Sequence, residues 1–201
     1  MDGAGDLIHV LAAAALGAHG GPFDAAHGQI KFGGNPQHRG ALQRLLLSVA
    51  AGGGFSLALA CDFRIMAKSA MLKQGYTSNG LTLDGGGTHT LPRLVGLSKA
   101  LEIISFDEPM NSEKALALNL VNDVVDDDDV MNAAENMLQK ISGVSPVSFG
   151  YTKQLLYQSF QTSFESQLES ERRALSACAA GNDGKEGINA FLEKRKPEFN
   201  W

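Results

Sequence analysis

One glycine-rich stretch in the first half of the chain decides the expected fold. It reads Ala50-Ala51-Gly52-Gly53-Gly54-Phe55-Ser56-Leu57-Ala58-Leu59-Ala60-Cys61-Asp62-Phe63-Arg64-Ile65. Three consecutive glycines precede a run of small and apolar residues, which suggests a helix that begins where the backbone approaches another group closely. The residues that follow, from Phe63 to Ala67, alternate enough to form a strand. The stretch therefore predicts a glycine turn, a helix and a strand in direct succession.

A second run of glycines precedes another expected helix. It reads Gly85-Gly86-Gly87-Thr88 and is followed by the residues from His89 to Leu94. A helix N-terminus presents unpaired N–H groups and a positive dipole, so both runs are candidate binding sites. Neither run is followed by the Lys-Ser/Thr pair of a phosphate loop. A dinucleotide site is also weakly supported, because no acidic residue follows at the place expected for binding ribose. Tight packing of small residues is the alternative interpretation of both runs.

Outward from these runs, the hydrophobic pattern divides the chain into an α/β part and a helical part. Leu42, Leu45 and Leu46 follow helical spacing and predict a helix over 41–49. Beyond residue 125, apolar residues predict an amphipathic helix from Val130 to Ile141, and a long helix that begins at Ser145-Pro146 and is broken at Gly181-Asn182-Asp183-Gly184. We therefore expect an α/β core over residues 1–125 and a helical region over residues 126–201.

Composition excludes several functional classes. The 201 residues include 17 Lys and Arg against 22 Asp and Glu, a net charge of −5 that argues against binding to nucleic acid. No apolar run reaches the ~18 residues of a membrane span. The two cysteines form no CxxC pair, which favours a reducing compartment, and we expect a cytoplasmic protein. The histidines are scattered, and the four aspartates at 126–129 fit a helix start better than a metal site.

Four motifs together carry a resemblance to a known family. They are the stretch quoted first, the second glycine run with Leu91-Pro92-Arg93-Leu94-Val95-Gly96, then Ala115-Leu116-Ala117-Leu118-Asn119-Leu120-Val121-Asn122, and the ending that begins Glu186-Gly187-Ile188. In this order they resemble the crotonase (enoyl-CoA hydratase/isomerase) superfamily over about residues 48–199. The resemblance implies a ββα spiral core followed by a helical C-terminal trimerisation region, and a homotrimer or dimer of trimers as the assembly.

The family resemblance also implies a mechanism and two backbone donors. Enzymes of this family bind an acyl-CoA thioester with its carbonyl oxygen between two backbone N–H groups, which stabilise an enolate. One such donor typically contributes about 10²–10³ in rate. By position in the motif, Gly53 is one donor, and Gly5 in Gly3-Ala4-Gly5-Asp6-Leu7 is the other. No metal or redox cofactor is implied, since coenzyme A is part of the substrate.

Departures from the family pattern bear on the reaction. Hydratases of the family use two glutamates, and this chain has Ser56 and Tyr76 at those positions. Neither side chain can replace a carboxylate near neutral pH, and we expect both to line the substrate pocket. A hydrogen-bond donor is the alternative role for Tyr76. Asp84, just before the second glycine run, resembles instead the acid/base of the phenylacetate-pathway isomerase branch. Asp84 as the N-cap of the next helix is the alternative.

The resemblance therefore predicts isomerisation of an unsaturated acyl-CoA, with Asp84 as the proton shuttle. A dehalogenase branch has a nucleophilic Asp at the same place, but it is expected to have a Trp in its pocket, and the only Trp here is Trp201. Hydration, another CoA-thioester reaction or a non-catalytic acyl-CoA-binding protein remain alternatives, as does a phosphate-binding regulatory protein.

Two further expectations concern the ends of the chain. Lys194 and Lys196 would suit the phosphates of coenzyme A, as lysines of the family's C-terminal helix do, although solvated surface lysines are the alternative. In the family, strands precede the motif that contains Gly5 and the glycine run that begins at Gly52. These strands are not recognisable in this sequence. We therefore expect a core that is incomplete at the N-terminus.

Overall fold

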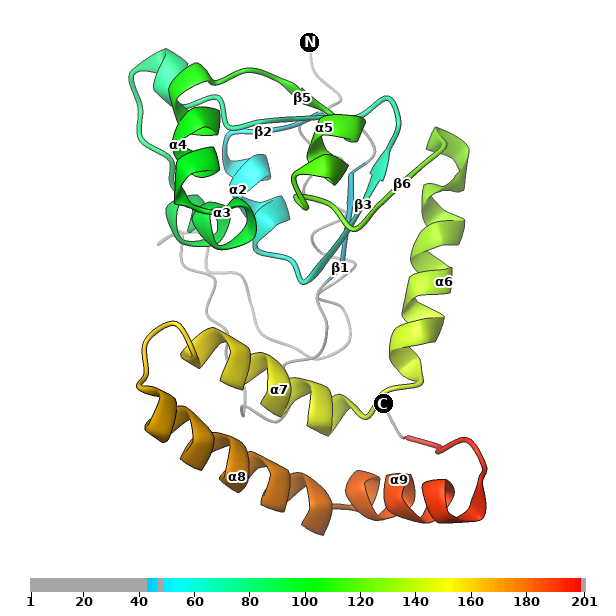
Figure 1. Cartoon of the computed structure of the whole chain (residues 1–201). Coiled ribbons are helices and arrows are strands. Elements are labelled where there is room, and N and C mark those ends of the chain that lie inside the picture. Colours follow the sequence, from blue (N-terminus) through cyan, green and yellow to red (C-terminus); the bar gives the residue numbers. More distant parts are fainter. Residues whose placement is uncertain (1–42, 47–48, 200–201) are drawn as a thin grey trace, which may run out of the picture. The chain divides into compact units, whose positions relative to one another are not determined.

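The computed structural model of the chain describes residues 43–46 and 49–199 (Figure 1). These residues divide into two compact units, the first ending at Asn136 and the second beginning at Met137. The division falls within helix α6 (Val130–Ser142). In the first unit, short strands alternate with helices, whereas the second is helical.

Strands and helices of the first unit follow each other at short intervals. In chain order they are β1 (Gln43–Leu46), β2 (Val49–Ala51), α2 (Gly53–Leu59), β3 (Phe63–Ala67), β4 (Met71–Lys73), the 3-10 helix η2 (Thr77–Asn79), α3 (Gly87–Val95), α4 (Leu97–Phe106), β5 (Met110–Asn111), α5 (Ser112–Ala117), β6 (Asp123–Val125) and the 3-10 helix η3 (Asp127–Asp129). The glycine turn, helix and strand predicted from the central stretch are therefore confirmed.

The described strands form two small sheets. One has the order β1-β3-β6 and is parallel throughout, with Leu45 opposite Ile65 and Ile65 opposite Asp123. The other has the order β2-β4-β5, in which β2 and β4 are parallel and β5 is antiparallel to β4. Parallel neighbours require crossover connections, and α2 lies on the path from β1 to its partner β3.

A prediction about the N-terminal side of the glycine motif is wrong. The leucine spacing predicted a helix over 41–49, but Gln43–Leu46 forms strand β1 and Val49–Ala51 forms strand β2. Both pair with strands that lie C-terminal to them in the sequence, so long-range pairing overrides a local periodicity. Strands therefore do precede Gly52, contrary to our expectation. The strands expected before Gly5 lie outside the described residues.

The core of the first unit forms where α2 packs against the strands and α3. Its largest fully buried apolar side chains are Phe55, Ile65, Met66, Leu72, Leu91, Met110, Leu120 and Val130. Each such side chain stabilises the fold by about 1.5–3 kcal/mol relative to exposure. Arg64 is buried as well, and its guanidinium donates to the carbonyl oxygens of Leu120, at 2.6 Å, and Cys61. This arginine therefore ties the turn after α2 to the segment that enters β6.

In the second unit, three helices follow the end of α6: α7 (Pro146–Gln158), α8 (Phe164–Ala180) and α9 (Asn182–Glu193). The long helix predicted from Ser145 to the break at Gly181 is thus two helices, α7 and α8, which run antiparallel beside each other (Figure 1). Ser163 caps α8 by accepting a hydrogen bond from the N–H of Ser166 at 3.2 Å. Gln167 on α8 donates to the carbonyl of Leu155 on α7 at 3.1 Å, which joins the two helices.

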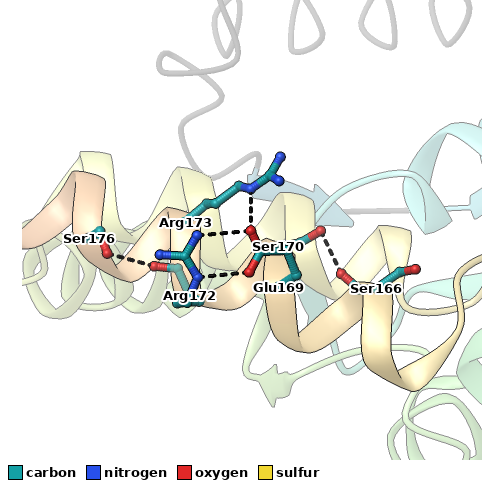
Figure 2. Close-up of polar contacts among 6 residues, drawn as sticks. All are labelled: Ser166, Glu169, Ser170, Arg172, Arg173 and Ser176. Atoms are coloured by element: carbon teal, nitrogen blue, oxygen red, sulfur yellow. Dashed lines mark hydrogen bonds and ion pairs between the residues drawn. The ribbon is translucent and has the colours of Figure 1, made fainter.

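The surface of α8 has both charged and apolar residues. Figure 2 shows Glu169 accepting hydrogen bonds from Arg172 and Arg173, each at 2.7 Å from the guanidinium Nε. These hydrogen bonds lower the pKa of Glu169 to about 2, and the one from Arg172 has the largest effect. Large apolar side chains on α8 and α9 are exposed: Phe164, Leu168, Leu175, Ile188, Phe191 and Leu192. No helix among the described residues is long and apolar enough to cross a membrane.

Candidate active site

The first glycine run forms a turn that only glycine adopts easily. Gly52 has φ +55° and ψ −128°, and its N–H donates to the carbonyls of Lys73, at 3.2 Å, and Gln74, at 3.1 Å. The turn is thereby fixed to the end of β4. Gly53 begins α2, and within the described part of the chain its N–H donates to no other group. An unpaired N–H at the first residue of a helix is available to an oxygen of a ligand.

The structure brings Tyr76 and Asp84 together with this turn. The Tyr76 hydroxyl donates a hydrogen bond to Oδ1 of Asp84. The same hydroxyl oxygen lies 3.8 Å from the position that a Cβ atom would take on Gly53, and 4.0 Å from the corresponding position on Gly52. Three residues predicted for the site, Gly53, Tyr76 and Asp84, are therefore neighbours in space.

The environment of Tyr76 keeps its phenol protonated. Partial burial raises the pKa of Tyr76 to about 12, and the hydrogen bond and negative charge of Asp84 add to the effect. The phenol is therefore a hydrogen-bond donor, and not a base, throughout the neutral range.

The loop that bears Tyr76 is held by two polar side chains that the sequence analysis did not select. Gln74 is fully buried; its Oε1 accepts from the N–H of Tyr76 at 2.9 Å, and its Nε2 donates to Thr77 Oγ1 at 2.6 Å. Asp107, which is 5% exposed, accepts from the N–H groups of Gly75, at 2.8 Å, and Ser78, at 3.3 Å, and from the Ser78 hydroxyl.

Asp107 ends α4 with a left-handed backbone, φ +47°. Burial alone would raise the pKa of its carboxyl, but the hydrogen bonds from Ser78 and Gly75 outweigh burial and hold the pKa below its ordinary value. A turn signal was visible in Asp107-Glu108-Pro109. Nothing in the local sequence indicates that this aspartate contacts a loop some thirty residues earlier.

The second glycine run lets two helices pack closely against each other. A Cβ on Gly87 would lie 2.6 Å from Ser56 Oγ and 2.8 Å from Leu83 Cδ2, and one on Gly85 would lie 3.1 Å from Ser56 Cβ. Ser56 is fully buried, and its hydroxyl has no hydrogen-bond partner among the described residues. The glycines therefore allow α2 and the start of α3 to come into contact at Ser56.

The capping alternative for Asp84 is wrong. Helix α3 begins after Gly86, which is its N-cap with φ +83°, and no side chain caps it. Asp84 contributes only its backbone carbonyl, which accepts from the N–H of Gly87 at 2.9 Å. Its carboxylate is exposed and accepts a hydrogen bond from the Tyr76 hydroxyl instead.

The remaining predicted site residues are not brought to this cluster by the described contacts. Lys194 and Lys196 are exposed and belong to the second unit, whereas the cluster belongs to the first. Between them, Arg195 is bonded to Glu186 at 2.6 Å and Glu193 at 2.6 Å. Gly5 lies outside the described residues. In the described part of the chain, no group of three or more His, Cys, Asp or Glu side chains could hold a metal ion.

Comparison with known proteins agrees with the fold. Residues 48–201 match the family model described as enoyl-CoA hydratase/isomerase. A probable enoyl-CoA hydratase of Bacillus subtilis is 40% identical over 151 residues, 75% of this chain and 58% of that protein. A 1,2-epoxyphenylacetyl-CoA isomerase of Escherichia coli is 32% identical over 151 residues, again 75% of this chain and 58% of the relative.

A solved structure supports the same fold. The crystal structure of an enoyl-CoA hydratase from Polaromonas sp. JS666 aligns with a TM-score of 0.71 at 34% identity, covering 76% of this chain and 60% of the other. The predicted α/β class with its crotonase-like core is thereby confirmed. The chain spans about 58% of the length of the curated relatives that it matches. Several further relatives have hydratase names, so the comparisons support the family more broadly than any single branch.

Proposed function

The chain belongs to the enoyl-CoA hydratase/isomerase family, and from that membership we propose that it moves the double bond of an unsaturated acyl-CoA. In a 3-enoyl-CoA, Asp84 would take a proton from C2, and the negative charge would pass to the thioester oxygen. The N–H of Gly53, with that of Gly5 as the second donor, would stabilise this enolate. Asp84 would then return the proton to C4, which leaves the double bond between C2 and C3 with no net change in atoms.

The observation that carries the proposal is a single carboxylate that Tyr76 links to the glycine turn. Asp84 is bonded to Tyr76, and Tyr76 lies against Gly53, whose N–H is unpaired among the described residues. One carboxylate suffices for a proton shuttle, whereas addition of water needs an acid and a base around that water. Tyr76, with its pKa raised to about 12, does not supply the base.

Several parts of the proposal rest on the resemblance alone. We propose that Lys194 and Lys196 bind the phosphates of coenzyme A, that Ser56 and Tyr76 border the acyl group, and that the protein assembles as a trimer or a dimer of trimers. From the two cysteines, which form no CxxC pair, we also propose a cytoplasmic location. The reaction proposed here uses no metal or redox cofactor. The phenylacetate-pathway isomerase branch is the proposed relationship, supported by the E. coli isomerase among the relatives.

Hydration of a 2-enoyl-CoA is the second candidate. It is favoured by the names of the relatives from Bacillus subtilis, Clostridium acetobutylicum and Syntrophomonas wolfei, which are hydratases. A non-catalytic acyl-CoA-binding protein is the third, because Ser56 and Tyr76 replace the glutamates that hydratases of the family use.

An activity assay separates the three candidates. The purified protein is given 3-enoyl-CoA and, separately, 2-enoyl-CoA, and the 2-enoyl and 3-hydroxyacyl products are measured. We expect 3-enoyl-CoA to become 2-enoyl-CoA without a 3-hydroxyacyl product. Asp84→Asn should lower kcat by about 10²- to 10⁴-fold, the usual contribution of a general base, and should retain acyl-CoA binding.

Asp128→Asn is the matched control, since Asp128 is an exposed aspartate of η3 and is not part of the proposed site. It should leave kcat unchanged. Formation of 3-hydroxyacyl-CoA would replace the isomerase proposal with the hydratase one. Tight acyl-CoA binding with no turnover of either substrate would assign the protein to the non-catalytic class.

A further inference from the structure

Asp84 lies in a segment that does not by itself fix the direction of a side chain. Residues 81–84 form neither helix nor strand, and Asp84 is exposed. A carboxylate in such a segment can rotate, and a general base must be held within hydrogen-bond reach of its proton. Something outside this segment must therefore orient Asp84 if it is to act as proposed.

Tyr76 supplies that contact. Its hydroxyl donates to Oδ1 of Asp84, and in the described part of the chain no other donor reaches this carboxylate. The ring is rigid and only two side-chain torsions join it to the backbone, so fixing the backbone of Tyr76 restricts its hydroxyl to a few positions. Since Oδ1 accepts from the phenol, Oδ2 remains available for proton transfer.

The backbone of Tyr76 is fixed in turn from two sides. Gln74 Oε1 accepts from the N–H of Tyr76 itself, and Asp107 accepts from the residues on either side, Gly75 and Ser78. Gln74 and Thr77 are also bonded to the carbonyl of Ile104 on α4, at 3.4 Å from Gln74 Nε2 and 2.5 Å from Thr77 Oγ1. Gln74 and Asp107 are buried, so their hydrogen bonds are shielded from competition with water.

We propose that Tyr76 is a positioning residue that aims Asp84 for proton transfer, and that Gln74, just after β4, and Asp107, at the end of α4, hold Tyr76 in place. The inference rests on the proposed function, because it assigns a task to Asp84. It assigns a supporting role to Tyr76, Gln74 and Asp107, none of which takes part in proton transfer.

Tyr76→Phe tests the inference, because it removes only the hydroxyl. A hydrogen bond to a charged group, when lost, should lower kcat by about 10- to 100-fold. KM should change by less than about threefold, since binding of the ground state is not altered. Tyr151→Phe on α7 is the matched control and should leave kcat unchanged.

A double-mutant cycle distinguishes positioning from a merely structural effect. If Tyr76 acts through Asp84, then Tyr76→Phe in an Asp84→Asn background should cost less than about twofold more. An equal loss in both backgrounds, or a wild-type kcat in Tyr76→Phe, would overturn the inference.

A measurement that needs no turnover separates this inference from the proposed function. The protein is labelled with 3-fluorotyrosine, and the Tyr76 resonance is assigned by its loss in Tyr76→Phe. Asp84→Asn should shift this 19F resonance at neutral pH, and Asp128→Asn should not. If the shift is seen without any isomerase activity, the contact stands and the proposed function fails. If isomerisation depends on Asp84 but its substitution leaves the resonance in place, the positioning inference fails alone.

Discussion

At the scale of single residues, the most constrained position is Gly87, where the packing of two helices leaves no room for a side chain. A Cβ there would lie 2.6 Å from Ser56 Oγ and 2.8 Å from Leu83 Cδ2, both of which are inside the fold. We expect Gly87→Ala to lower the free energy of unfolding by about 1–3 kcal/mol, the usual cost of overpacking. Urea denaturation measures it. Gly86→Ala would not be a fair control, because Gly86 has φ +83°; Gly54→Ala is suitable, since a Cβ there meets nothing within 4 Å.

Ser56 gives the opposite expectation. Its hydroxyl is fully buried and has no hydrogen-bond partner among the described residues, so burying it costs free energy that an apolar atom would not. Ser56→Ala should therefore leave stability unchanged or raise the free energy of unfolding by up to about 2 kcal/mol. A fall in the melting temperature would show that the hydroxyl has a partner in solution that stabilises it.

At the scale of elements, the sequence predicted the helices with glycine starts and missed what long-range pairing decides. The two glycine runs predicted α2 and α3 correctly, because a glycine turn before a helix is a local signal. The leucines before Val49 have helical spacing, yet the segment pairs as β1 with β3. The apolar spacing of 145–168 continues across the turn between α7 and α8, so periodicity alone could not place the break.

The candidate site shows the same division between local and distant signals. Gly53 and Asp84 could be selected because they stand in motifs, and the structure brings them together through Tyr76. Asp107 could not be selected, because its importance comes from contacts with residues near Tyr76 that are remote in sequence.

The contact between α4 and the Tyr76 loop predicts a pH dependence of stability. The folded-state pKa of Asp107 is lowered from 3.8, so its charged form stabilises the fold above that value. This stabilisation is lost as the pH falls through the lowered folded pKa. Asp107→Asn removes this charged acceptor, so the variant should be less stable at pH 7, and its difference from the wild type should shrink below pH 3.8.

Chemical denaturation of both proteins between pH 7 and the acid range measures this difference. Other acids with lowered pKa values, such as Glu169 and Glu186, titrate alike in both proteins and cancel in the comparison. A difference between the two proteins that stays constant with pH would show that the charge of Asp107 does not stabilise the loop.

At the scale of the whole molecule, helices α8 and α9 expose several large apolar side chains. Phe191 is 81% exposed, Phe164 73% and Leu175 72%, and large apolar side chains exposed to this extent on two neighbouring helices favour a contact with another protein. The family resemblance implies that the partner is a further copy of the same chain. We therefore expect the purified protein to sediment as a trimer or a dimer of trimers in analytical ultracentrifugation.

Phe191→Lys places a charge on that surface without touching the cluster of Gly53, Tyr76 and Asp84, which belongs to the other unit. Burying an unpaired ammonium group in an interface costs about 2 kcal/mol or more, so the variant should shift toward smaller assemblies. Gln139→Lys adds the same charge to an exposed polar position of α6 and should keep the wild-type sedimentation. If both variants sediment as the wild type does, α9 does not form the interface. A monomeric wild type would mean instead that these side chains are not buried by self-association, and that the apolar surface has another partner.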